Sequence, residues 1–216
     1  MFYALLGGAA AFALASVSVT ADPGPASPSE ATLAQVKAVI EKYKDVKAAL
    51  ADGYIPDPAG MCETAEMMGK PSKLGAMGIH YFRPDLLGIT APPNPRVDGN
   101  GTYTDFHKPA VLLYEPEADG SLQLIGAENL VFEKAWKAAG HQQPPSFHGV
   151  PFDYMVDDPA TKIDEAHGFM PHYDRHVWAI RDNPNGVFAQ YNPKVSCAAH
   201  KPAMAGSMSH QHSGNR

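Results

Sequence analysis

The 216-residue chain carries 17 Lys and Arg against 23 Asp and Glu, which gives a formal net charge of −6 at pH 7. Its basic residues are scattered, and this argues against a nucleic-acid partner, because proteins that bind nucleic acid gather cations to replace phosphate counterions. The chain also lacks the phosphate-loop, dinucleotide-binding, nucleophile-elbow, H-E-x-x-H and C-x-x-C motifs. The enzyme classes that depend on those motifs are therefore not indicated.

The N-terminus is apolar, and no charged side chain precedes Asp22. The run Val19-Thr20-Ala21 places small or β-branched residues where a signal peptidase reads them, although the first residues contain no Lys or Arg. We expect residues 1–21 to be a cleaved signal peptide and the protein to be secreted or periplasmic. The alternative is an uncleaved membrane anchor, since about 20 apolar residues can span a bilayer.

The two cysteines are Cys62 and Cys197. An even number of cysteines in an exported chain predicts a disulfide, which here closes a loop of about 135 residues. The chain-entropy model assigns such a loop roughly 4–5 kcal/mol of stabilisation. Two free thiols or a thiolate metal pair are the alternatives.

Residues 22–29 are rich in proline and predict a linker, followed by a single globular domain over 30–199. Ser29 can cap a helix, and Gly53 suits its end. Apolar residues recur between them at spacings of three and four, the pattern of an amphipathic helix. They are Leu33, Val36, Ile40, Tyr43, Val46 and Leu50.

Beyond this helix the chain changes to short apolar runs separated by Pro and Gly. Residues 55–76 resemble a loop, and an Asp-Gly turn between two apolar runs predicts a hairpin. We predict strands at 77–82, 110–115, 122–132, 151–156 and 173–181. The long loops 88–105 and 157–171 are typical of functional segments. The predicted fold is α+β, with an N-terminal amphipathic helix packed on a mostly antiparallel sheet, long loops and one disulfide.

Residues 200–216 show no apolar periodicity and predict a disordered tail. The tail contains Met204, Met208, His210 and His212, a composition that also occurs in copper-chelating segments.

Four residues form the candidate metal site. His172 and His176 are four apart, so their rings share a face in either a strand or a helix. Imidazole is the commonest protein ligand for transition metals. His80 lies in another predicted strand, where the small Gly78 leaves space on the same face. Glu128 falls within a predicted buried strand, and a buried carboxylate is costly unless it is paired or binds a metal.

Each of these residues has a simpler interpretation. The two histidines of the pair can be hydrogen bonded within a sheet, and His80 can be an ordinary core residue. Glu128 can pair with Arg175 or Arg181. Three loop histidines are weaker candidate ligands: His107, His148 and His167. A His–Asp dyad with Asp153 or Asp174 is a further possibility.

Five ordered blocks and a preceding alanine-rich helix that ends in Gly53-Tyr54 resemble a group of uncharacterised bacterial secreted proteins. The blocks are Met77 to Tyr81, Val111 to Pro116, His172 to Trp178, Asn183 to Ala189 and Asn192 to Cys197. The resemblance covers roughly residues 32–197. It implies export and a single domain, but no particular activity. It also favours the four candidate ligands, because three of them lie within these blocks.

The leading hypothesis is therefore an exported protein with a histidine-lined pocket that binds copper, zinc or iron, for storage or catalysis. His80, His172 and His176 are the expected ligands, with Glu128 as fourth ligand or orienting group. We expect three aromatic side chains to line the site: Tyr81, Tyr173 and Trp178. The alternatives are a metal-free enzyme or small-molecule-binding protein of the cell envelope that uses histidine acid–base chemistry, and a structural module. We expect no nucleic-acid partner and no stable membrane insertion after cleavage.

Overall fold

The computed structural model of the protein describes residues 29–58, 60–89 and 96–201. The expected signal peptide and almost all of the expected linker and tail lie outside these residues. Those three expectations, and the single domain between them, stay predictions. No helix in the described part of the chain is long and apolar enough to cross a membrane.

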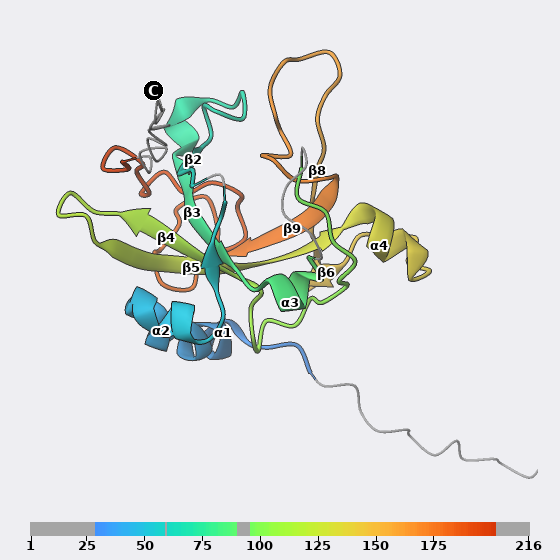
Figure 1. Ribbon diagram of the computed structural model, residues 1–216, viewed down its shortest axis with the longest axis horizontal. Coiled ribbons are helices and arrows are strands. Elements are labelled where there is room, and N and C mark those ends of the chain that lie inside the picture. The colour runs from blue at the N-terminus through green and yellow to red at the C-terminus, as the bar shows by residue number, and fades with distance from the viewer. Residues whose placement is uncertain (1–28, 59, 90–95, 202–216) are drawn as a thin grey trace, which may run out of the picture.

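An antiparallel sheet organises the fold (Figure 1). Its strands lie in the order β1-β3-β4-β5-β9-β8, and β2 pairs separately with β3. Their bounds are β1 (Ile55–Pro56), β2 (Glu63–Thr64), β3 (Ala76–Phe82), β4 (Val111–Pro116), β5 (Leu122–Phe132), β8 (Asp153–Met155) and β9 (His172–Val177). A small hairpin joins β6 (Ser146–Phe147) to β7 (Val150–Pro151). The expected mixture of helix and mostly antiparallel sheet is thus confirmed.

The expected N-terminal helix is divided into three pieces. They are α1 (Leu33–Ile40), the 3-10 helix η1 (Glu41–Lys44) and α2 (Val46–Ala51). The break is at Asp45, whose backbone is extended and whose carboxylate accepts a hydrogen bond from the Lys47 amide. Thr32, rather than Ser29, caps α1, because Thr32 and Gln35 form a reciprocal capping box. Gly53 follows α2 with φ of +89°, as a helix C-terminus favours.

Three further short helices were not anticipated. They are η2 (Ser72–Leu74), α3 (Pro84–Leu87) and α4 (Glu133–Ala138). Each is shorter than two turns, too short for apolar periodicity to distinguish it from a loop.

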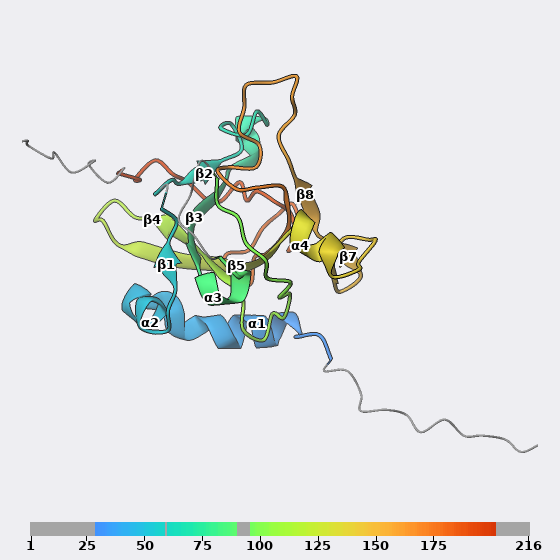
Figure 2. The ribbon, with the colours of Figure 1, turned by 45° about the vertical axis from the view of Figure 1, so that its right-hand side comes forward.

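The two faces of the sheet have different covers. Val36 and Ile40 of α1 pack on one face, against side chains such as Leu112 and Val131. The other face carries a second apolar cluster that includes Leu113. Figures 1 and 2 show α1 and α2 on the first side, and β2 with the 157–171 loop on the second. The candidate metal ligands lie on this second face, away from α1 and α2.

The predicted disulfide is present between Cys62 and Cys197, with a Cα–Cα distance of 5.6 Å. It ties the segment that carries β2 to the C-terminal part of the described chain. Glu63 directly follows the first cysteine and pairs with Gly78 of β3. Gly78 has φ of +99°, and a Cβ there would lie 2.5 Å from the Tyr114 carbonyl oxygen. Its lack of a side chain therefore permits close strand pairing, rather than leaving the space for His80 that the sequence suggested.

Candidate metal centre

Strand β9 presents alternate polar residues to the side of the sheet that faces away from α1 and α2. His172, Asp174 and His176 occupy every second position, and each is completely buried. Tyr173 and Val177 pack instead in the cluster beneath the helices. The alternation of a strand therefore separates the row of His172, Asp174 and His176 from the opposite row, in which Arg175 lies between Tyr173 and Val177.

Three of the four expected ligands come together. Glu128 of β5 pairs directly with His176 of β9, so both side chains project from the same face. His80 reaches the same point from β3, across the intervening strand β4. One donor atom from each of these residues lies within 4.8 Å of the other two. We call His80, Glu128 and His176 the first site.

The spacing within the first site matches the edges of a metal coordination shell. The distances from Glu128 Oε2 are 3.2 Å to His80 Nε2 and 3.4 Å to His176 Nε2. Ligand atoms about 2.0–2.1 Å from a tetrahedral metal lie about 3.3 Å apart. Neither contact has hydrogen-bond geometry, and among the described residues these three atoms have no hydrogen-bond partner. Buried polar atoms that converge without bonding to one another can be satisfied by a cation.

His172 does not belong to the first site, contrary to the expectation from sequence. It lies four residues, and hence about 13 Å, further along the strand. It forms a separate group with His167 and Asp174, again with one donor atom of each within 4.8 Å of the others. The distance from His172 Nε2 to Asp174 Oδ2 is 3.9 Å, and the ring centroids of His167 and His172 are 5.2 Å apart. We call His167, His172 and Asp174 the second group.

Glu63 lies between the two sets. Its Oε1 is 3.8 Å from His80 Nδ1 of the first site and 3.4 Å from His167 Nδ1 of the second group. Only 1 % of its surface is exposed. It is held between the disulfide at the preceding Cys62 and the pairing of Glu63 with Gly78 of β3.

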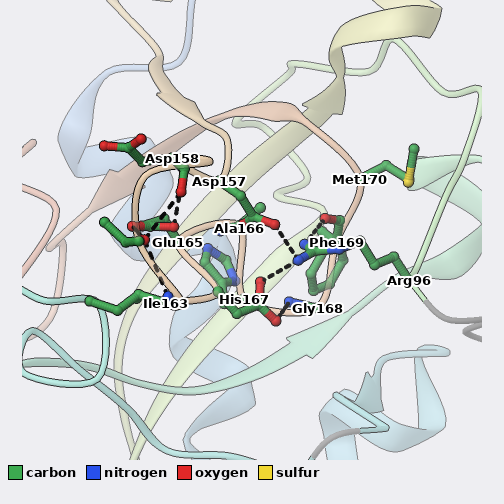
Figure 3. A network of polar contacts seen from close by, with 12 residues as sticks. Arg96, Asp157, Asp158, Ile163, Glu165, Ala166, His167, Gly168, Phe169 and Met170 are labelled. Atoms are coloured by element: carbon green, nitrogen blue, oxygen red, sulfur yellow. Dashed lines mark hydrogen bonds and ion pairs between the residues drawn. The ribbon is translucent and has the colours of Figure 1, made fainter.

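His167 is supplied by the long loop 157–171, and Figure 3 shows how that loop is held. Arg96 donates to the Phe169 carbonyl at 2.7 Å and to Asp157 at 2.5 Å, and it pairs with Asp164 at 3.0 Å. His167 has φ of +39°, an unusual value for a residue with a side chain. The surrounding contacts thus hold this histidine in a costly backbone conformation while its ring is buried.

Burial and opposite charges divide the histidines into two types. Burial lowers the pKa of His172 to about 3 and, despite the Glu128 carboxylate, that of His176 to about 4. Burial also opposes protonation of His80, but Glu63 and Glu128 outweigh it and raise the pKa of His80 to about 10. The metal-free protein therefore holds His80 as an imidazolium and the two β9 histidines as neutral rings.

The carboxylates are perturbed as strongly. Burial opposes ionisation of Glu128, but His176 and His80 outweigh it and lower its pKa to about 2. Burial raises the pKa of Asp174 well above its usual value, and the Glu128 charge adds to the shift. Asp174 has no hydrogen-bond partner on either oxygen among the described residues. Such strongly shifted groups, collected in one place, are typical of functional sites.

Other candidates from the sequence lie elsewhere. His107 bonds to Asp105 at the surface, and His148 bonds to the Ala31 carbonyl. The ion pairs of Arg175 and Arg181 are with Asp153 and Glu115 respectively, rather than with Glu128.

Only one of the three expected aromatic side chains contacts the site. The Trp178 ring stacks near His176, at a centroid distance of 6.0 Å. Tyr81 and Tyr173 belong to the cluster under the helices, because odd and even positions of a strand face opposite sides.

Sequence reasoning missed Glu63 and treated Asp174 only as a dyad partner. Asp174 had a usable signal, since it lies midway between His172 and His176 and a strand places all three on one face. Glu63 had none, because its position depends on a disulfide and a two-residue strand.

An open pocket of about 500 Å³ adjoins this region, between β8 and the 157–171 loop. Tyr191 lines it, and the Tyr191 hydroxyl is buried without a hydrogen-bond partner among the described residues. Burial raises the pKa of Tyr191, and the charges of Asp174 and Glu63 add to the rise. Tyr191 therefore lines the pocket and is also close enough to the buried carboxylates for their charges to raise its pKa.

No protein-family model matches the chain, and no curated protein or solved structure matches it. The resemblance to uncharacterised bacterial secreted proteins stays an expectation, and the function is argued from the site alone.

Proposed function

We propose that the protein binds one transition-metal ion at the first site, through His80, Glu128 and His176. The observation that carries the proposal is the pair of contacts at 3.2 and 3.4 Å from Glu128 Oε2 to two imidazole nitrogens, neither of them a hydrogen bond. Without a cation, these buried atoms are compensated by the charge interaction of His80 with Glu128 but have no hydrogen-bond partner among the described residues.

The donor set favours some metals over others. Two imidazoles and one carboxylate suit zinc, copper and iron, whereas calcium and magnesium prefer oxygen ligands alone. Three protein ligands leave at least one position open on a four-coordinate metal. An ion held in this way can be stored, or can activate a bound water molecule.

Glu63 acts on the first site by orienting His80. Its carboxylate faces His80 Nδ1, while the other ring nitrogen faces Glu128. A carboxylate behind a ligating histidine fixes the ring orientation and increases its basicity. Metal binding at His80 Nε2 displaces the proton that the metal-free protein holds there.

Export is part of the proposal. It is supported by the disulfide, which is typical of oxidising compartments, and by the apolar N-terminal segment of the sequence. N-terminal sequencing of the protein recovered from the periplasm or medium tests it. A protein that starts after Ala21 agrees with export, and one that remains in the cytoplasm contradicts it.

Elemental analysis of the full chain, purified without chelator and without an affinity tag that contains histidine, tests metal binding. We expect about one equivalent of zinc, copper or iron to be lost in Glu128→Gln, which keeps the shape of the side chain and removes its charge. His107→Ala is the matched control, because His107 is exposed and remote from the first site.

One result of the elemental analysis would contradict metal binding at the first site. Equal metal content in the wild type, Glu128→Gln and His107→Ala overturns the proposal, since an ion held elsewhere would be common to all three. Loss of metal in Glu128→Gln is informative only if the variant is folded, so its melting curve and circular dichroism are measured alongside.

A further inference from the structure

One metal ion does not satisfy the buried polar groups on this side of the sheet. Among the described residues, the ion-pair partners of Glu63, Glu128 and Asp174 are imidazoles only. An ion at the first site leaves both oxygens of Asp174 and Nε2 of His172 buried without a hydrogen-bond partner among the described residues. Asp174 is farthest from compensation, because both of its oxygens are unbonded and its side chain is completely buried.

The second group has the donors for another ion. His167, His172 and Asp174 place one donor atom each within 4.8 Å of the others, the same criterion that the first site meets. The His172 Nδ1 lies 3.0 Å from the Met170 carbonyl, which leaves Nε2 facing Asp174 Oδ2. A backbone carbonyl behind the ring is the usual arrangement that directs the opposite nitrogen to a metal.

We propose that His167, His172 and Asp174 bind a second divalent transition-metal ion, so that the protein contains a two-metal centre linked through Glu63. The inference rests on the proposed function of the first site. An ion bound there would give these buried donor atoms the partner that they otherwise lack among the described residues.

Glu63 makes the two sites neighbours rather than independent. One oxygen of this carboxylate contacts a ligand of each, His80 at 3.8 Å and His167 at 3.4 Å. The His80 and His167 rings are nearly parallel, with centroids 6.2 Å apart. If each ring binds an ion, the Glu63 carboxylate therefore lies beside a ligand of both ions.

The second site differs from the first in its attachment. The first site is built from three strands of the sheet, but His167 comes from the 157–171 loop and is held by contacts such as Arg96 with Asp157. A ligand on a loop can be withdrawn more easily than one on a strand. We therefore expect the ion at the second group to bind more weakly than the ion at the first site. Under chelation, the ion at the second group should dissociate before the other.

Zinc binding to the full-length protein after complete chelation and desalting tests the inference by stoichiometry. Four proteins are compared: wild type, Glu128→Gln, Asp174→Asn and His107→Ala. Zinc held elsewhere, for instance by the C-terminal histidines, is common to all four proteins. Differences in zinc content between them therefore report only the ions bound at the first site and the second group. We expect the two buried-site variants each to bind about one equivalent less than the wild type and the control.

A second measurement tests whether the two ions are neighbours. In the fully copper(II)-loaded wild type, we expect dipolar coupling between the two ions to broaden the paramagnetic resonance signal. Asp174→Asn, which would hold copper at the first site alone, is expected to give the narrower signal of an isolated ion.

The results separate the two proposals. Loss of one equivalent in Glu128→Gln with no loss in folded Asp174→Asn overturns the second site and leaves the first. Loss in Asp174→Asn alone overturns the first site and with it the two-metal centre. No loss in either variant overturns both sites. Loss of one equivalent in each variant without dipolar broadening in the wild type overturns the placement of the two ions as neighbours.

Discussion

Glu128 and His176 are direct partners across the β5–β9 pairing, and His176 Nε2 lies 3.4 Å from Glu128 Oε2. This relationship is set by strand register. A slip of one residue in β9 would bring His176 to the helix side of the sheet and Val177 to the metal side. Tyr173 and Val177 hold the register, because their apolar side chains pack in the cluster under α1. The site is thus aligned by the same pattern that builds the core.

Metal binding at the first site should quench the fluorescence of Trp178. Its ring lies 6.0 Å from that of His176, so a copper(II) ion on His176 is near enough to quench it strongly. In Trp136→Phe, which leaves Trp178 as the single tryptophan, we expect saturable quenching with copper(II) in a fluorescence titration.

Two companion proteins check the assignment. Trp178→Phe keeps Trp136, which stacks on the exposed His141, and should show only weak quenching. Trp136→Phe combined with Glu128→Gln should lose the saturable phase. Quenching that survives in the latter protein would place the copper elsewhere.

Removal of the disulfide should weaken both folding and metal binding. The loop it closes has a sequence separation of 135 residues, for which the chain-entropy model gives about 5 kcal/mol. In Cys62→Ser/Cys197→Ser we expect the free energy of unfolding to fall by up to that amount in urea titrations. Glu63 should lose its fixed position, so zinc affinity should fall too. Unchanged zinc affinity in the folded double variant would show that Glu63 is held by β2 pairing alone.

Acid should destabilise the metal-free protein through His172. The folded-state pKa is about 3, because burial and His167 oppose protonation, and the reference value is 6.5. The contribution of neutral His172 to the free energy of unfolding is complete above pH 6.5. It is lost as the pH falls towards 3, because in this range only the unfolded chain binds a proton at His172. The loss is at most about 1.4 kcal/mol per pH unit.

The effect is isolated by comparing two proteins in urea titrations between pH 6.5 and 4.5. One is Asp174→Asn and the other is Asp174→Asn/His172→Gln, so that Asp174, whose pKa burial raises, titrates in neither. Titration of His167 enters both curves. We expect the difference in free energy of unfolding between them to shrink as the pH falls, whereas parallel curves would contradict a neutral, buried His172.

Much of the sheet could be predicted from sequence, and the reason is visible in β5. Its eleven residues, Leu122–Phe132, form an apolar run after an Asp-Gly turn, a signal that depends on neighbouring residues alone. The same is true of Gly53, which ends α2 with positive φ. Glu128 was recognised because it is a carboxylate within a predicted buried strand, and His176 because its spacing of four from His172 places both rings on one face.

The grouping of the ligands could not be predicted, because it depends on contacts distant in sequence. His172 and His176 share a face, but whether they share a metal depends on which strand, and which loop, covers each of them. His80 arrives across β4, and His167 arrives from a loop fastened by Arg96. The break at Asp45 in the N-terminal helix was missed for a different reason, since an apolar stripe continues across a short 3-10 segment.

Arg96 should control the second site without touching it. Its guanidinium holds Asp157, Asp164 and the Phe169 carbonyl, on both sides of His167 in the loop (Figure 3). In Arg96→Ala the loop loses these contacts, so His167 should leave its strained conformation more readily. We expect zinc affinity at the second site to fall roughly tenfold or more in competition with a chromophoric chelator, while the first site retains its affinity.

Lys194→Ala is the matched control for Arg96, because it removes a surface ion pair with Asp182 on a different segment. Limited proteolysis supplies an independent readout: cleavage within 157–171 should accelerate in metal-free Arg96→Ala and not in Lys194→Ala. Zinc should slow that cleavage in the wild type, since the second ion ties His167 to β9. If zinc leaves the cleavage rate of the wild type unchanged, the loop does not contribute a ligand, and the second ion cannot be bound as proposed.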